Sequence, residues 1–366
     1  MKILGIESSC DDTSVALIKV NKNDFIVLAE KTASQIEIHK KYGGVVPEIA
    51  GRMHAEKILP VIEEVMKDQD KPDVIAVTCG PGLITGLLVG VEAAKSLSYL
   101  WNVPLVAVNH IEGHIHSVEI SHEQFSISNI QYPALALIAS GGHTELIWIK
   151  SKGQYKKIGA TVDDAAGECF DKTAKLLNLE YPGGPKISQY AETGNNKAIN
   201  FPRPMLDKNN YDFSFAGLKT SALYWLKDNK LIMLNKITSN TTKSKHLNDQ
   251  KVFPTNTQEN ITIHDFCASF EQAIIDVLVG KTLKALKKYQ PKTVILGGGV
   301  SANKKLRQTL ATEINKLSPK LKFLSPSLKY AMDNATMIAL VGYYKALKKE
   351  YTSWQNIKAN PNWEIE

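Results

Sequence analysis

The sequence predicts an α/β protein built from two related lobes with a nucleotide cleft between them, and two observations lead to this fold class. First, a pattern of strand, short polar turn and strand occurs near residue 3 and again near residue 134. Second, a chain of 366 residues is long for one core and suits two domains. A repeated hairpin with helices in between is typical of paired lobes that bind a nucleotide where they meet.

Both predicted hairpins carry polar residues at their tips. The first joins residues 3–6 to 13–18 through a turn of hydroxyls and carboxylates, Glu7-Ser8-Ser9-Cys10-Asp11-Asp12. The second joins 134–139 to 145–149 through Ser140-Gly141-Gly142-His143-Thr144. Because strands with small polar turns bring such side chains to one end of a sheet, we expect both tips to face the cleft.

Further elements follow from apolar runs and the residues that break them. Residues 74–78 are predicted as a buried strand, Gly80-Pro81-Gly82 as a turn and 85–97 as a helix. No charge lies between Asp73 and Glu92, but glycines and a proline interrupt this stretch, so we expect no membrane span. Later elements are expected as a helix over 163–175, a loop over 181–185, helices over 218–226 and 264–286, a strand over 292–296 and a basic helix from Lys304.

Composition favours a soluble protein of the cytoplasm. Hydrophobic residues make up 43% and charged residues 22% of the chain, which is the globular range. The four cysteines form no Cys-x-x-Cys pair, which argues against a disulfide framework or a structural zinc site and favours a reducing compartment. Acidic residues from Glu7 onward leave no room for a signal peptide. The net charge of +7 is compatible with a nucleic-acid partner.

Residues 235–260 are predicted to form a flexible surface insertion, because they are rich in Asn, Thr, Lys, Ser and Gln. A basic arm for RNA is the alternative. Asp249 and Glu259 dilute its charge, however, and it has no aromatic stacking pattern.

Two histidines one helical turn apart are candidate metal ligands. They stand in Asn109-His110-Ile111-Glu112-Gly113-His114, after the apolar run 103–108. Side chains at i and i+4 share one helix face, so both imidazoles can reach one ion. Glu112 lies roughly 200° around the helix from His110, so it should point away from the metal, unlike the glutamate of His-Glu-x-x-His metalloproteases. A pair of histidines with ordinary hydrogen bonds remains the alternative.

Asp333, at the start of a late apolar helix, could complete this site. Two histidines and one carboxylate form a metal site with positions left open for a substrate. A carboxylate at that place could instead cap the helix. The glycine-rich turn 297–303 is similarly ambiguous, because such glycines allow either close approach of a ligand or tight packing.

From end to end, apart from 235–260, the chain resembles the tRNA adenosine threonylcarbamoyltransferase family, whose members were formerly labelled O-sialoglycoprotein endopeptidases. The resemblance lies in ordered motifs at 5–13, 42–48, 80–83, 109–114, 140–144, 165–172, 181–185, 213–220 and 297–303. It implies the fold of actin, sugar kinases and the Hsp70 ATPase, with actin-like lobes at 1–130 and 131–332 and a late helix at about 333–350 packed back near the first lobe.

The resemblance also implies a reaction. Family members transfer a threonylcarbamoyl group from threonylcarbamoyl-AMP to N6 of the adenosine just 3′ of the anticodon, position 37, in tRNAs that read codons beginning with A. His110, His114 and Asp333 would hold one divalent metal, with iron(II) favoured over zinc. Asp11 is the candidate to accept the amine proton or orient the amine, with Asp12 equally close in sequence. The adenylate, or ATP or ADP in its place, would contact Ile138, Ala139, Ser140, Gly141 and Gly142 with its phosphate and acyl portion, Asp171 and Gly184 with its ribose, and Gly298, Gly299 and Asn303 near its adenine.

Family members of bacteria work with a catalytically silent paralogue of the same fold and a small P-loop ATPase, so the resemblance implies these partners as well as tRNA, and no membrane. Three rival functions can be weighed on the residues. A kinase or ATPase of this fold would place carboxylates and magnesium in the cleft, a protease would need Glu112 near the metal, and a scaffold subunit would have a degenerate metal site. One departure from the family pattern is Ser188, which stands where some members carry an acidic residue near the ribose.

Overall fold

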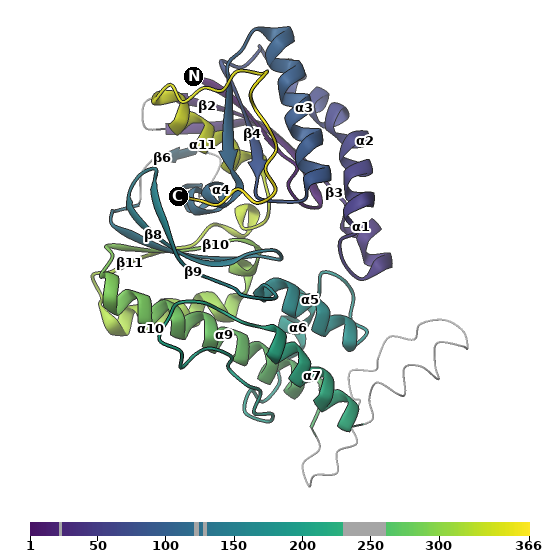
Figure 1. Cartoon of the computed structure of the whole chain (residues 1–366), viewed down its shortest axis with the longest axis vertical. Helices are drawn as coiled ribbons and strands as arrows, with labels where there is room; N and C mark the ends of the chain where they lie inside the picture. The colour runs from purple at the N-terminus through teal and green to yellow at the C-terminus, as the bar shows by residue number, and fades with distance from the viewer. Residues whose placement is uncertain (22–23, 121–123, 127–129, 230–260) are drawn as a thin grey trace.

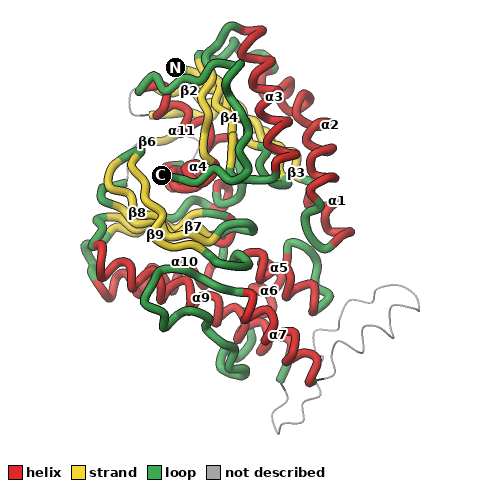
Figure 2. The backbone as a smooth tube through the Cα atoms, viewed as in Figure 1, coloured by secondary structure: helices red, strands yellow, loops and turns green. Residues whose placement is uncertain are grey.

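The computed structural model describes residues 1–21, 24–120, 124–126, 130–229 and 261–366. It has two lobes, each built on one sheet, with the short helix α4 (His110–His116) between the sheets (Figures 1 and 2). The predicted insertion at 235–260 lies outside the described residues.

The first sheet has six strands in the order β5-β4-β1-β2-β3-β6. Strands β1, β4 and β5 are parallel. Strand β2 pairs antiparallel with β1, and β3 pairs antiparallel with β2, so that β3 again runs in the direction of β1. The strand bounds are β1 Lys2–Glu7, β2 Asp12–Asn21, β3 Asp24–Ser34, β4 Val74–Gly80, β5 Leu105–Asn109 and β6 Gln124–Ser126.

Helices cover both faces of this sheet because its strands are apolar on both sides. In β1, Ile3 faces helix α11 (Ala335–Leu347), while Leu4 and Ile6 face α2 (Pro47–Met66) and α3 (Ile84–Trp101). Helix α11 therefore packs against the first sheet although it lies late in the chain (Figure 1). A short helix, α1 (Ile36–His39), follows β3.

The second sheet has five strands in the order β11-β10-β7-β8-β9. Their bounds are β7 Ala134–Ala139, β8 Thr144–Ser151, β9 Gln154–Ala160, β10 Thr293–Gly297 and β11 Lys322–Leu324. One face packs on a helical layer, and the other packs on Ile111 and Ile115 of α4. The helices of that layer are α5 Ala166–Leu176, α6 Gly183–Ala191, α7 Ala216–Asp228, α9 Ile263–Tyr289 and α10 Lys304–Leu317.

Both sheets repeat one topology. In each, the first strand pairs antiparallel with the second strand of a hairpin and parallel with a strand that comes much later in the chain. The predicted hairpins at 3–18 and 134–149 are thus confirmed, and so is the α/β fold class of two related lobes.

The structure differs from the sequence predictions at two places. Helix α5 begins at Ala166 rather than Asp163, because the Asp163 carboxylate instead accepts hydrogen bonds from the backbone N–H groups of Phe215 and Ala216 at the start of α7. The predicted loop 181–185 is partly helical, since α6 begins at Gly183. Pro185 does not prevent this start, because proline is tolerated in a first helical turn, where its missing N–H would have no partner inside the helix.

Within the part of the chain that the structure describes, no helix has the length and apolar character needed to cross a membrane.

Candidate metal centre and nucleotide site

Asn109 fixes the start of the helix that carries both histidines. Its side-chain oxygen accepts hydrogen bonds from the backbone N–H groups of Ile111 and Glu112, which caps α4. The histidine spacing then places His110 and His114 on one face of α4, with their ring centroids 4.6 Å apart.

Asp333 meets these two histidines, as the sequence predicts. Its Oδ1 lies 3.1 Å from Nε2 of His114 and 3.5 Å from Nε2 of His110. One ligand atom of each residue lies within 4.8 Å of the others. Among the described residues this is the group of histidines and acids that could hold a metal ion.

The alternative role for Asp333, a helix cap, is taken by its neighbour. Asn334 accepts the hydrogen bond from the backbone N–H of Met337 and is the N-cap of α11. The Asp333 carboxylate is therefore left to face the histidines.

The surroundings fit a bound cation. His114 is fully buried, and its Nδ1 has no hydrogen-bond partner among the described residues, whereas its Nε2 faces the Asp333 carboxylate at 3.1 Å. Nε2 of His110 faces the same carboxylate oxygen, so the three groups converge as ligands around one cation do. Burial lowers the pKa of His114, which keeps the imidazole in the neutral form that binds metals. Two imidazoles and a carboxylate suit iron(II) or zinc better than magnesium.

Glu7 supports His110 from behind, a role that the sequence analysis did not assign. Nδ1 of His110 donates to Oε2 of Glu7 at 2.9 Å, and Thr78 donates to the same oxygen at 2.7 Å. Burial alone would raise the pKa of Glu7, but His110 outweighs it and the pKa lies below its ordinary value. A proton held on Nδ1 leaves the Nε2 lone pair for a metal, which is the usual role of a carboxylate behind a metal-bound histidine.

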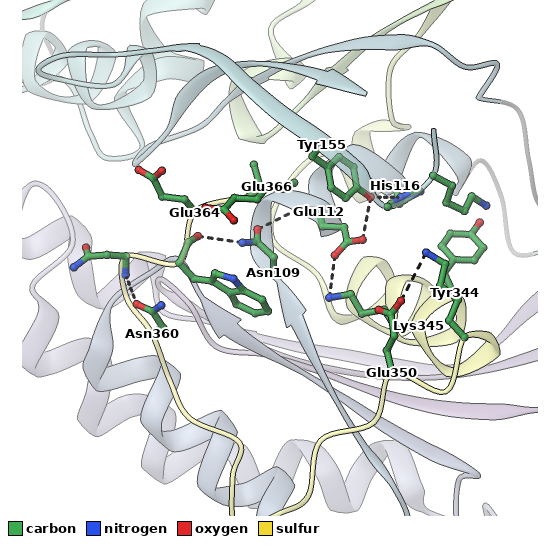
Figure 3. A pocket seen from close by; sticks show the side chains of 16 residues that line it. Asn109, Glu112, His116, Tyr155, Tyr344, Lys345, Glu350, Asn360, Glu364 and Glu366 are labelled. Carbon is green, nitrogen blue, oxygen red and sulfur yellow. Dashed lines mark hydrogen bonds and ion pairs between the residues drawn. The ribbon is translucent and has the colours of Figure 1, made fainter. Parts of the chain in front are cut away.

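Glu112 points away from the metal ligands, as its spacing predicts. It accepts a hydrogen bond from Tyr155 and pairs with Lys345 in a separate cavity (Figure 3). A metalloprotease mechanism with Glu112 as the base is therefore excluded by position.

The tip of the first hairpin lies beside the candidate metal ligands and contacts the second lobe. Tyr181 donates to Oδ2 of Asp11 at 3.3 Å, and burial with the nearby Asp333 raises the pKa of Asp11. Asp12 lines a cavity of about 630 Å³ together with Asp333. Burial raises its pKa to about 7, and its buried Oδ1 has no hydrogen-bond partner among the described residues.

The tip of the second hairpin offers space. Ile138 and Ala139 are buried at the end of β7, whereas a Cβ atom at Gly141 or Gly142 would meet no described atom within 4 Å. Ser140 closes the turn, since its N–H donates to the carbonyl of His143. Burial, followed by the charge of His110, lowers the pKa of His143 to about 4, which places this turn near the metal ligands.

Asp171 and Gly184 come together at the start of α6. Oδ1 of Asp171 accepts hydrogen bonds from the N–H groups of Gly183 at 2.7 Å and Gly184 at 3.3 Å. Burial raises the pKa of Asp171 to about 6, with Asp11 contributing. Within the described residues Oδ2 makes no hydrogen bond, so one carboxylate oxygen remains for a ligand.

Asn303 is already engaged within the protein. It caps α10 by accepting from the N–H of Leu306, and its amide donates to Ser188 and to the buried Glu271. Glu271 was not singled out from the sequence, where it is one acid within a long apolar helix. A nucleobase would have to compete for the Asn303 amide or lie against it.

The glycine-rich turn is tightly packed at two of its glycines, whereas close approach of a ligand to it stays a prediction. Gly298 has φ +82°, and a Cβ there would lie 2.4 Å from the carbonyl oxygen of Ala139, so tight packing requires glycine. Gly297 packs in the same way on the carbonyl of His114. Gly299 is looser, with the sulfur of Met332 at 3.3 Å from such a Cβ. The turn thus seats the second sheet against α4.

A family model described as tRNA N6-adenosine threonylcarbamoyltransferase matches residues 26–340. A relative of the same description from Thermosipho africanus (strain TCF52B) is 42% identical over 372 residues, which cover 100% of both chains. The chain belongs to the tRNA N6-adenosine threonylcarbamoyltransferase family. A further family relative, from Bacillus subtilis (strain 168), is 42% identical over 369 residues, covering 100% of this chain and 96% of its own.

Solved structures agree on the fold. A full-length HypF in a phosphate- and nucleotide-bound form aligns with a TM-score of 0.56 at 14% identity, covering 96% of this chain and 56% of that one. The HypF of T. kodakarensis aligns with a TM-score of 0.55 at 12% identity, covering 97% of this chain and 49% of that one. The expected fold of actin, sugar kinases and the Hsp70 ATPase is thus confirmed. As a threonylcarbamoyltransferase family member, the protein is an acyltransferase that modifies N6 of an adenosine in tRNA.

Proposed function

We propose that this family member transfers the threonylcarbamoyl group from threonylcarbamoyl-AMP to N6 of adenosine 37 in tRNAs that read codons beginning with A, and releases AMP. The observation that carries the proposal is the convergence of His110, His114 and Asp333 beside two polar hairpin tips, one from each lobe. A sugar kinase or ATPase of the same fold has no need of paired imidazoles, and a scaffold subunit has no need of an intact ligand set.

The reaction requires an activated acyl donor. The N6 amine of adenine is a poor nucleophile because its lone pair is delocalised into the ring. In the proposed step, N6 forms a bond to the carbamoyl carbon while the bond from that carbon to the phosphate oxygen breaks. AMP leaves with the electron pair, and the amine loses a proton.

Residues of the second lobe would bind the adenylate. The turn from Ile138 through Ala139, Ser140 and Gly141 to Gly142 would lie along its phosphate and acyl portion, where the open space at the two glycines leaves room for them. Asp171 would accept hydrogen bonds from the ribose hydroxyls through Oδ2, beside Gly184. Gly298, Gly299 and Asn303 would lie near the adenine.

His110, His114 and Asp333 would hold one divalent metal, with iron(II) favoured and zinc the alternative. When bound there, a metal ion supplies Lewis-acid polarisation of the transferred carbonyl group. Glu7 keeps the proton on Nδ1 of His110 and so orients this ligand.

Asp11 is the residue proposed to take the proton from the amine or to orient the amine, with Asp12 as the alternative. Asp11 is tied to Tyr181 of the second lobe, and Asp12 has a pKa of about 7. A base with a pKa near the working pH is the most effective one. Asp11→Asn and Asp12→Asn, compared at one metal occupancy, separate the two roles: the base variant loses single-turnover transfer, and the other retains it.

The partners proposed for this chain are tRNA, a catalytically silent paralogue of the same fold and a small P-loop ATPase. ATP or ADP would bind where the adenylate binds. A tRNA substrate and four free cysteines favour the cytoplasm.

The test is nucleoside mass spectrometry on tRNA that reads codons beginning with A, after incubation with this protein, its partners and threonylcarbamoyl-AMP. We expect a threonylcarbamoyl mass gain on adenosine that His110→Ala abolishes while the variant stays folded. No gain with folded, metal-loaded protein, and with partners that are active with another family member, would favour the ATPase or scaffold function. Full transfer by His110→Ala would refute the metal role.

A further inference from the structure

Behind α4, a cavity of about 470 Å³ is lined by residues of both lobes (Figure 3). Four of its side chains form what we call the rear-face network: Glu112 and His116 from α4, Tyr155 from β9 and Lys345 from α11. None of them contributes to the proposed chemistry. Glu112 and His116 lie on the opposite face of α4 from His110 and His114, since residues two apart in a helix point in nearly opposite directions.

Glu112 uses its two carboxylate oxygens on two different elements. Tyr155 donates to Oε1 at 2.9 Å, and Nζ of Lys345 lies 3.2 Å from Oε2. Nε2 of His116 lies 3.1 Å from the Tyr155 hydroxyl. Glu112 is only 8% exposed, and a buried charge is held in place by its partners, whose removal is strongly destabilising.

The network connects the two helical segments that supply the metal ligands. His110 and His114 lie on α4, and Asp333 lies two residues before α11. Near its start, α11 packs directly on Gly113, where a Cβ would lie 3.0 Å from Ile338 and 3.1 Å from Met337. Near the end of α11, Lys345 forms the ion pair with Glu112. Two contact points separated along α11 fix the angle between the helices, whereas one would leave it free to turn.

Tyr155 adds the second sheet to this arrangement. Burial and the adjacent Glu112 raise the pKa of Tyr155 well above its ordinary value, so its hydroxyl stays a donor. Strand β9 pairs with β8, which begins at Thr144, directly after the hairpin tip at Ser140–His143. A shift of α4 would therefore also change its place relative to that tip.

We propose that Glu112, Tyr155 and Lys345 are positioning residues, which hold α4 at the angle to α11 that lets His110, His114 and Asp333 share one divalent cation. This inference rests on the metal centre of the proposed function.

Cobalt(II) is a suitable probe, because its visible absorption bands report the ligand geometry in addition to the affinity. We expect Tyr155→Phe and Lys345→Met in the full chain to bind Co(II) about tenfold more weakly than the unaltered protein, with changed bands. Glu112→Gln keeps an oxygen for Tyr155 and loses the ion pair, so it should fall between the unaltered protein and Glu112→Ala.

Two matched controls come from the same region. Tyr132→Phe removes a half-buried hydroxyl that makes no hydrogen bond among the described residues, and Lys157→Met removes an ion pair from β9 to Glu364 that does not involve α4. Both should leave the Co(II) affinity and bands unchanged.

Rear-face variants that melt at a lower temperature but bind Co(II) with unchanged affinity and bands would overturn the inference, since their role would then be structural only. Co(II) binding by the unaltered protein that survives His110→Ala would instead contradict the metal centre itself. The two failures are thus distinguishable.

Discussion

At the scale of single residues, neighbouring side chains divide two tasks at the metal centre. Asn334 caps α11, so that Asp333 beside it can face the histidines; Asn109 likewise caps α4 directly before His110. The sequence indicated His110 and His114 as candidate ligands because their i, i+4 spacing is local, whereas Asp333 joined them as a ligand through the family resemblance. It could not assign Glu7 to His110, since the two are 103 residues apart and no local pattern records such a contact.

Replacing Glu7 should weaken the metal centre without removing a ligand. In Glu7→Gln, the amide is a poorer acceptor for Nδ1 of His110 than the carboxylate, so we expect metal affinity to fall about 10- to 100-fold. A metal titration followed by calorimetry measures this. Glu64→Gln, on the exposed side of α2, is the control, and equal affinity of all three proteins would refute the role of Glu7.

Asp171 should give the reaction an acidic limb. Burial raises the pKa of Asp171 to about 6, so its carboxylate gains a proton as the pH falls through that value and then accepts ribose hydrogen bonds less well. We expect KM for the adenylate to rise below about pH 6 and this rise to vanish in Asp171→Asn. The proposed base, Asp11 or Asp12, would instead lower kcat as the pH falls, and Asp171→Asn should keep that decline.

Asp164 offers the comparison for this pH profile. Lys219 and Lys172 outweigh its burial and hold its pKa below the ordinary value, so it stays ionised across this range. Asp164→Asn should therefore keep the rise of KM at low pH, and a rise of KM that persists in Asp171→Asn would assign it to another group.

At the scale of elements, the sequence predicted those with clear periodicity and misplaced some of their starts. The hairpins, β4 and α9 follow from apolar runs. The start of α6 at Gly183 was missed, because it is held by a carboxylate from another helix, Asp171. The role of Gly297 and Gly298 stayed open for the same reason: the atoms that crowd them belong to β7 and α4.

Two glycines of the proposed nucleotide site should respond differently to alanine. Gly298 has φ +82° and no space for a Cβ, so Gly298→Ala should lower the free energy of unfolding by about 2 kcal/mol or more. Gly141 has open space around it, so Gly141→Ala should change the free energy of unfolding by less than about 0.5 kcal/mol. Urea unfolding measures both, and equal losses would contradict this assignment.

At the scale of the whole molecule, repeated hairpins predicted two related lobes, and the matching strand orders of the two sheets confirm them. The lobe boundary near residue 130 stays a prediction. The sequence could not show that α4 packs on the second sheet while α11 packs on the first, because this depends on contacts between distant segments.

A metal that joins α4 to α11 should stabilise the molecule. Any ligand that binds only the folded state adds stability, about 2.7 kcal/mol at a hundredfold excess over Kd. We therefore expect zinc to raise Tm, EDTA to reverse the rise, and His114→Ala to show neither effect. Scanning calorimetry measures these shifts of Tm, and an equal rise of Tm in His114→Ala would place the metal elsewhere.

The amide of Asn109 donates to the carbonyl of Trp363, 254 residues further along the chain, and Asp333 also follows long after the histidines. On the ribosome, where folding starts from the N-terminal side, His110 and His114 emerge long before their third ligand. The nascent chain thus exposes an incomplete donor set, which would bind metal weakly. Loading of the proposed centre with metal would then be a late event of biosynthesis, after both lobes have packed on α4.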